Sequence, residues 1–147
     1  MATVRGCVFP DHLLYDVPHH TWYTPVDDGL LRFGISEVGL LLAREVLVFT
    51  PKRVGHEFEK DRSLATLESA KWVGSVRSAF DGTVVAINEA LVQRATLANE
   101  DCYGEGWMLL VCPAQSDWRE GLVTGAEIAP AYEAWMESAA FAGRGIF

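Results

Sequence analysis

The sequence predicts a mainly β protein of the sandwich or barrel type, with short helices on its periphery. Short segments rich in β-branched and aromatic residues recur along the chain, and residues that favour turns separate them. The chain has 147 residues, half of them hydrophobic and 22% charged, so it is long enough to bury a core. No low-complexity linker, tandem repeat or break in composition divides it. We therefore expect a single domain over residues 1–147.

Seven segments have the composition of strands: 22–24, 30–35, 46–50, 64–67, 73–77, 83–87 and 107–111. Asp27-Asp28-Gly29 provides turn chemistry between the first two segments, and Asp81-Gly82 stands directly before the sixth. A first helix is predicted over residues 36–44. Ser36 is its N-cap, an acidic residue follows in the first turn, and a cluster of leucines is expected to face inward.

A second helix is predicted near the end of the sequence, over residues 130–137. Proline is favoured in a first helical turn, and this start places Tyr132, Trp135 and Met136 on one face. Thr124 and Glu127 form a rival capping-box start. Proline 130 would then kink the helix, so we prefer the later start.

Charge and cysteine content exclude several classes of function. The chain carries 12 basic and 20 acidic residues, and a net charge of −8 has the wrong sign for binding nucleic acid or an anionic membrane. Three cysteines without paired spacing argue against a disulfide framework or a zinc knuckle, which favours a reducing compartment. The apolar stretches are far shorter than the roughly 20 residues that span a membrane, and no secretion signal is visible. We expect a cytoplasmic protein.

Lysine is scarce in this chain and its distribution is uneven. Lys52, Lys60 and Lys71 are the only three, so most of the basic charge comes from arginine. Lys71 lies between two predicted strands, where a tight turn should project its amine away from the sheet. By itself this indicates only an accessible surface lysine.

Several motifs that follow one another along the chain single out Lys71 as a functional residue, because together they resemble the glycine cleavage system H protein family. They are Glu68-Ser69-Ala70-Lys71, Asn88-Glu89-Ala90-Leu91, the run from Asn99 to Trp107, His20-Thr21-Trp22, Phe33-Gly34-Ile35-Ser36, and Ala131-Tyr132-Glu133-Ala134. The run Asn99 to Trp107 is the most specific. The resemblance covers about residues 15–136, which is nearly the whole chain.

The resemblance implies a barrel-sandwich hybrid of the lipoyl-domain type, with short peripheral helices and a C-terminal helix. It implies that lipoic acid is amide-linked to Lys71 at a hairpin tip. An exposed turn suits that chemistry, since an amine that attacks an activated acyl group must be sterically free and able to lose its proton. The protein would be a non-catalytic carrier, in which the cofactor supplies the chemistry and the chain supplies position and recognition.

The neighbours of Lys71 are candidate recognition residues. Glu68 and Ser69 belong to the family motif, and Glu68 is either read by the lipoate-attaching enzyme or a solvated carboxylate at a strand end. Trp72 either packs back onto the barrel or offers a docking surface and a shelf for the arm. The sequence leaves both choices open.

Other conspicuous residues are expected to be structural. The two glycines of Tyr103-Gly104-Glu105-Gly106-Trp107 suggest positive φ or close backbone approach, with Trp107 entering a strand as a core residue. His19 and His20 would point to opposite faces of an extended strand and make a poor metal chelate, so we expect no metal site. Cys102 is expected to be a small buried or semi-exposed thiol rather than a reactive one.

The residues after Lys71 depart from the glycine-cleavage pattern. The run Trp72-Val73-Gly74 is similar to the H-like lipoate-binding proteins of the sulfur-oxidising, heterodisulfide-reductase-like system, and we favour that branch over glycine cleavage. The lipoyl dithiol would then carry a sulfur intermediate or its electrons rather than an aminomethyl group. A non-lipoylated H-like adaptor is a further alternative, whereas the usual Met-Lys-Met setting of a biotin carrier is absent.

The resemblance also implies partners. A lipoate-protein ligase, or an octanoyltransferase with lipoyl synthase, would attach the cofactor. The heterodisulfide-reductase-like complex or the glycine cleavage enzymes would use it, and dihydrolipoamide dehydrogenase would reoxidise it.

Overall fold

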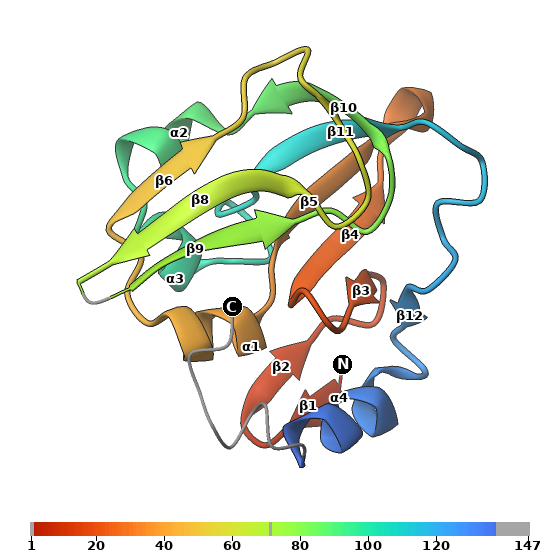
Figure 1. The fold of residues 1–147 in the computed structure, drawn as a ribbon. Helices are drawn as coiled ribbons and strands as arrows, with labels where there is room; N and C mark the ends of the chain where they lie inside the picture. Colours follow the sequence, from red (N-terminus) through yellow and green to blue (C-terminus); the bar gives the residue numbers. More distant parts are fainter. Residues whose placement is uncertain (1, 71, 138–147) are drawn as a thin grey trace.

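The computed structural model describes residues 2–70 and 72–137, and two antiparallel sheets packed face to face dominate it (Figure 1). The larger sheet has the strand order β12-β3-β4-β5-β11-β10-β7, and the smaller has the order β6-β8-β9. The fold is therefore mainly β, as the sequence predicts.

The elements follow one another with short connections. The strands are β1 (Ala2–Val4), β2 (Cys7–Phe9), β3 (Leu14–Asp16), β4 (Thr21–Pro25), β5 (Leu31–Ile35), β6 (Val48–Pro51), β7 (Glu57–Phe58), β8 (Ser63–Ser69), β9 (Trp72–Arg77), β10 (Gly82–Ile87), β11 (Leu109–Pro113) and β12 (Val123–Thr124). The helices are α1 (Glu37–Ala43), α2 (Glu89–Gln93), α3 (Leu97–Glu100) and α4 (Ile128–Met136), with a 3₁₀ turn at Asp27–Gly29.

The main core lies between the two sheets. Its buried side chains come from alternate positions of facing strands, such as Phe33 and Leu109 on the larger sheet and Phe49 and Leu67 on the smaller. This packing fixes which face of β8 and β9 is turned inward, and so which face is left to solvent.

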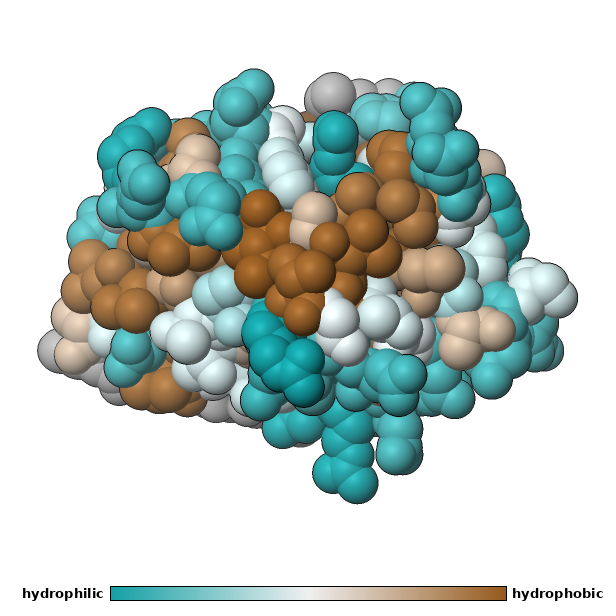
Figure 2. All heavy atoms as spheres, turned by 90° about the horizontal axis from the view of Figure 1, so that it is seen from above, coloured by the Kyte–Doolittle hydropathy of each residue, from teal (hydrophilic) through white to brown (hydrophobic). Residues whose placement is uncertain are grey.

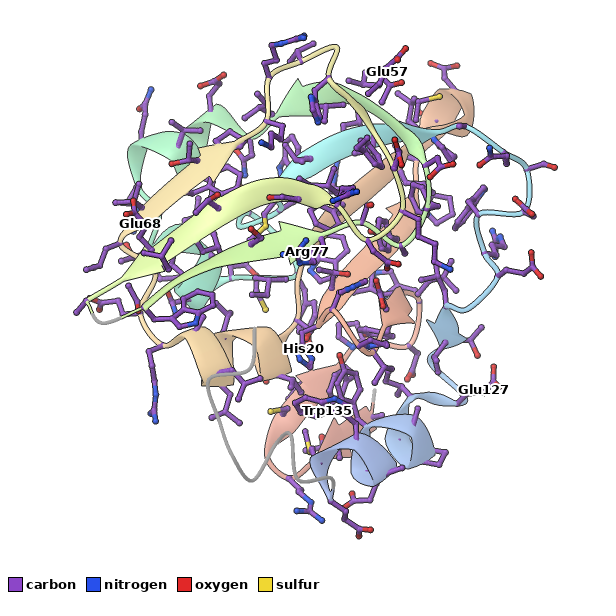
Figure 3. The ribbon with its side chains drawn as sticks, viewed as in Figure 1. His20, Glu57, Glu68, Arg77, Glu127 and Trp135 are labelled. Atoms are coloured by element: carbon purple, nitrogen blue, oxygen red, sulfur yellow. The ribbon has the colours of Figure 1, made fainter. Side chains whose placement is uncertain are left out.

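A second core lies beside the first, under the N-terminal hairpin β1–β2 and helix α4. Phe9 is fully buried there and stacks on Tyr132, with ring centroids 4.7 Å apart. His20 and Trp135 point toward one another in Figure 3, with an edge-to-face contact of 4.5 Å between ring centroids. The C-terminal helix is thus packed against strands from the first quarter of the chain.

The predicted helices form, with two corrections. Ser36 is the N-cap of α1, and its hydroxyl accepts the amide of Gly39 at 3.4 Å. The expectation that the leucines of this helix face inward holds in part: Leu40 and Leu42 are partly buried against the two cores, whereas Leu41 is 45% exposed. The fully buried residues of the helix are Val38, Gly39 and Ala43. The smaller side chains are buried because α1 packs closely: a β-carbon at Gly39 would overlap the side chain of Ile35.

Helix α4 begins at Ile128, two residues before the predicted start. Its earlier start needs no kink at residue 130, because a proline in the first turn removes an amide hydrogen that has no partner within the helix. The rival pair does interact, as the Thr124 hydroxyl donates to Glu127 Oε1 at 3.1 Å, but it forms the turn that precedes the helix. Tyr132 and Met136 are buried and Trp135 packs beside them, as predicted.

Part of the described surface around β10 is apolar. In Figure 2 a band of hydrophobic side chains crosses the face that carries β10 and the loop before β7. Val54 and Val85 are 55% and 37% exposed, and the Gly55 amide donates to the Val84 carbonyl at 2.8 Å, which brings the two segments together. Among the described residues no helix is long and apolar enough to cross a bilayer.

Candidate functional site

The hairpin β8–β9 positions the segment that the sequence singles out. Antiparallel pairing runs from Ser63 opposite Arg77 to Ser69 opposite Trp72, so the strands stay paired to the last residue before the connection. Residues 70 and 71 make that connection, and Ala70 is exposed. The hairpin extends away from the body of the molecule in Figure 1.

Lys71 itself lies outside the described residues. The structure describes the strand ends that flank it. The Ser69 hydroxyl donates to the carbonyl of Trp72 at 3.5 Å, which links the two strand ends by a side-chain contact. A two-residue connection between fully paired strands is the geometry of a tight β-hairpin.

Trp72 lies on the inward-facing side of the hairpin. It is paired with Ser69, two residues from the pair Leu67–Gly74, and Leu67 is buried in the main core. The Trp72 ring is partly buried and packs against this core. A β-carbon at residue 74 would overlap the indole, so Gly74 provides the space in which the ring lies.

Glu68 lies on the opposite, solvent-facing side of the hairpin. The strand register places it between Val48 of β6 and Val73 of β9, and cross-strand neighbours of this kind project from the same face. Glu68 is half-buried, whereas Val48 and Val73 are 43% and 63% exposed. In Figure 3 Glu68 lies toward the free end of the hairpin, and Arg77 lies at the other end of β9.

Val48 is a neighbour of the motif that the sequence did not identify. Strand alternation alone indicates that Val48 and Phe49 point to opposite faces. The pairing partner of β6 could not be inferred, because a long connection that includes β7 separates β6 from β8.

The residues expected to be structural are placed accordingly. Cys102 is 5% exposed, and burial raises the pKa of its thiol to about 12. Gly106 is closely approached by backbone, since a β-carbon there would lie 2.8 Å from the carbonyl oxygens of Leu97 and Asp101. The expectation that Trp107 enters a strand is wrong: β11 starts at Leu109. The side-chain amide of Asn88 instead donates from Nδ2 to the Trp107 carbonyl at 2.7 Å, which ties this backbone to the start of α2.

His19 and His20 are separated by a turn rather than by an extended strand, because His20 has φ of 60°. The His19 ring lies in a surface hollow of about 480 Å³, with Nδ1 at 2.6 Å from Asp16 and Nε2 at 3.5 Å from Asp61. These contacts place the His19 ring between two carboxylates, which raise its pKa and would pair with its protonated form. Across residues 2–70 and 72–137, no group of three or more histidine, cysteine or acidic side chains is arranged to hold a metal ion.

Comparison with known protein families places the chain in a family. The model described as "Glycine cleavage H-protein" matches residues 13–135, most of the chain and both flanks of Lys71. The hairpin β1–β2 precedes the matched region.

Individual relatives agree with that match. The chain is 40% identical over 130 residues to glycine cleavage system H protein 5 of Aquifex aeolicus, covering 86% of this chain and 87% of the relative. It is 36% identical over 134 residues to H protein 2 of the same organism, covering 90% and 83%. A solved structure of a glycine cleavage system H protein from Mycobacterium marinum is similar, with a TM-score of 0.73 and 26% identity over 86% of this chain and 98% of that one.

Proposed function

Because the chain belongs to the glycine cleavage H-protein family, whose members are non-catalytic lipoyl carriers, we propose that it carries lipoate on Lys71. The observation that carries the proposal is the paired hairpin β8–β9, which brackets Ala70 and Lys71 between Ser69 and Trp72. The family motif and the hairpin connection therefore coincide in one short segment.

The surroundings of the connection fit a covalently attached arm. The flanking residue Ala70 is small and exposed, and Trp72 turns its ring inward over Gly74. The outward side of the strand ends is thus left to short side chains and Glu68. A lysine amine that must meet an acyl donor in another protein's active site needs such an approach.

A protein that carries a lipoyl group has to position the group, whereas the cofactor itself supplies the chemistry. When bound, the lipoyl dithiolane supplies thiol–disulfide exchange and group transfer. The hairpin supplies a fixed origin for the arm, and tethering replaces free diffusion by a high local concentration at each partner's active site. The proposed partners are a lipoate-attaching enzyme, the enzymes that load and unload the arm, and dihydrolipoamide dehydrogenase.

For the pathway we propose sulfur oxidation with a heterodisulfide-reductase-like complex. The support is the Trp72-Val73-Gly74 run, in which the indole occupies the space above the glycine and reshapes the side of the hairpin next to Lys71. Relatives with different numbers in one organism, such as H proteins 5 and 2 of Aquifex aeolicus, are consistent with members that serve different enzymes.

Glycine cleavage is the second candidate, and the family match and the names of the relatives support it equally well. In that case the arm would carry an aminomethyl group. A non-lipoylated adaptor is the third candidate.

The pathway is tested with the lipoylated protein and with the host. The protein is supplied to glycine decarboxylase and aminomethyltransferase, and its turnover is compared with that of an H protein of known glycine-cleavage function. A chromosomal Lys71→Arg strain is scored in parallel for sulfur oxidation and for growth on glycine. We expect poor glycine turnover and a sulfur defect. Efficient glycine turnover with intact sulfur oxidation would establish the glycine cleavage role instead.

A further inference from the structure

The outward face of the hairpin carries an apolar strip that the carrier function does not explain. Val48, Glu68 and Val73 lie in one cross-strand row of the sheet β6-β8-β9, and we call these three residues the tip strip. Both valines expose about half of their surface, at 43% and 63%. Leu47, which precedes β6 and donates its amide to the Glu68 carbonyl at 2.8 Å, is 49% exposed as well.

Packing does not account for these apolar side chains. The next residues inward on each strand, Phe49, Leu67 and Gly74, face the core, so the tip strip faces solvent. The following row on the outward face is polar, with Thr50, Thr66 and Ser75 paired across the same three strands. Apolar side chains are thus confined to the row nearest Lys71, although threonine would serve a strand equally well.

We propose that the tip strip is the docking surface for the enzyme that forms the amide bond at Lys71, a proposal that rests on lipoate attachment at this lysine. Of all partners, this enzyme must bring its acyl carbonyl within bonding distance of the lysine amine itself. An interface of ordinary size covers about 800 Å² on each partner, so one that encloses Lys71 extends over the residues two or three positions away.

The composition of the tip strip defines the partner surface that fits it. Two branched apolar side chains flank one carboxylate, so the enzyme should present an apolar groove with a cationic side chain opposite Glu68. The net charge of −8 favours a basic partner in the same way, through attraction over the whole approach. Trp72 faces inward on the same hairpin, whereas Val73 is a large exposed apolar side chain two positions from Lys71.

The test measures attachment kinetics with a double Val48→Thr/Val73→Thr variant. Threonine keeps the branched shape and strand preference but replaces a methyl group by a hydroxyl. The unmodified protein is incubated with the host's lipoate–protein ligase, lipoate and ATP, and intact mass is followed over a range of carrier concentrations. We expect KM for the carrier to rise about tenfold, with kcat changed less than about twofold, because the strip contributes binding shared by the ground and transition states.

The matched control is Val54→Thr/Val85→Thr, which makes the same chemical change at two exposed valines, one in the loop before β7 and one on β10, outside the sheet β6-β8-β9. Its KM should equal that of the wild-type protein, and all three proteins should melt within a few degrees of one another. Equal KM values for both double variants would overturn the docking surface while leaving attachment intact.

Two further outcomes would contradict the proposal. Sedimentation that shows a wild-type dimer and a monomeric Val48→Thr/Val73→Thr variant would assign the tip strip to a second copy of the chain. A wild-type protein that the ligase leaves unmodified would overturn the proposed attachment itself, and the docking surface with it. The Glu68→Gln variant tests the contribution of the carboxylate. It should raise KM for the carrier at low salt and make KM less dependent on ionic strength.

Discussion

At the scale of single residues, two adjacent histidines meet opposite electrostatic surroundings. A hydrogen bond to Asp16, together with the charges of Asp16 and Asp61, raises the pKa of His19. Burial lowers the pKa of His20 to about 4, with a smaller contribution from the charge of His19. At neutral pH His20 is therefore an uncharged ring between the barrel and α4, where it contacts Trp135.

The pKa shifts predict a stability optimum between the two titrations. His20 has a folded-state pKa below the unfolded value of about 6.5, so its contribution is present above pH 6.5 and is lost as pH falls through 4. The loss amounts to about 3 kcal/mol, at about 1.4 kcal/mol per pKa unit. His19 has a raised pKa, so its contribution is complete below pH 6.5 and is lost as pH rises through its folded-state pKa.

The measurement is an NMR titration of both imidazoles beside urea unfolding at pH 4 to 8. His19 should protonate above pH 6.5 and His20 below it. Two histidines that titrate together near 6.5 would show that the burial of His20 and the Asp16 contact of His19 do not persist in solution.

The sequence predicted those features that depend on residues close by in the chain. Ser36 was identified as an N-cap because a serine before a helical segment accepts a nearby amide whatever the tertiary context. The exposure of Leu41 and the start of β11 after Trp107 were not predicted. The Trp107 backbone depends on a partner 19 positions away, because the Asn88 side chain donates to its carbonyl. The exposure of Leu41 depends on which side of α1 packs against the barrel, and Gly39 sets that side by its close approach to Ile35.

At the scale of elements, the start of β9 is packed through one contact, in which the Trp72 ring lies over Gly74. The Trp72 ring covers Gly74 two positions along the same strand, and the larger sheet repeats the arrangement with Trp22 over Gly34 on the paired strand. An aromatic ring over a strand glycine restores the apolar contact that the missing side chain cannot make. The beginning of β9 thus depends on a specific pair.

Gly74→Ala should destabilise the protein by about 1–3 kcal/mol, because the added methyl displaces the indole. The same substitution in a Trp72→Ala background should cost less than about 1 kcal/mol, since the obstacle has been removed. Urea unfolding of the four proteins in this cycle gives the coupling. Additive costs would mean that the ring does not occupy the space above residue 74.

The predicted strands were found where hydrophobic alternation is long enough to be recognised. All seven predicted segments correspond to β4, β5, β6, β8, β9, β10 or β11, with shifted ends. The missed strands β1, β2, β3, β7 and β12 have two or three residues each, too few for a period to show. The start of β6 shifts to Val48 because the Val46 amide is bound by the side chain of Asn99, a contact that spans 53 positions.

At the scale of the whole molecule, two cores share strand β4, which contributes Tyr23 to one and Trp22 to the other, and polar contacts link them further. The Tyr103 hydroxyl donates to the Val8 carbonyl at 2.6 Å and accepts the Glu37 amide at 3.1 Å, while Glu37 Oε1 accepts the Val8 amide at 2.7 Å. These bonds tie the N-terminal hairpin to α1 and to the segment after α3. The hairpin that presents Lys71 belongs to the other core.

This division predicts that stability and carrier function can be separated. Phe9→Ala should cost about 3–5 kcal/mol, because the ring is fully buried against Tyr132. Well below the melting temperature, the rate of lipoate attachment should stay at the wild-type value. An attachment rate that falls with stability under those conditions would show that the second core shapes the hairpin.

The family-level fold was predictable because motifs spread over about residues 15–136 carry it. The N-terminal hairpin was not, since it precedes the region that the resemblance covers and its strands are short. At the candidate site, the sequence identified Glu68, Ser69 and Trp72, whereas Val48 required the register of β6 on β8.

The central claim is that Lys71 carries the lipoyl group, and one digestion tests it directly. Cleavage after arginine places the three lysines in three different peptides, with Lys52 in residues 45–53, Lys60 in residues 54–62 and Lys71 in residues 63–77. In protein purified from the native host, mass spectrometry should find the mass of one lipoyl amide on the peptide 63–77, and the other two peptides unmodified. An unmodified peptide 63–77 from cells that are actively using the pathway, or a lipoyl group on either other peptide, would contradict the account.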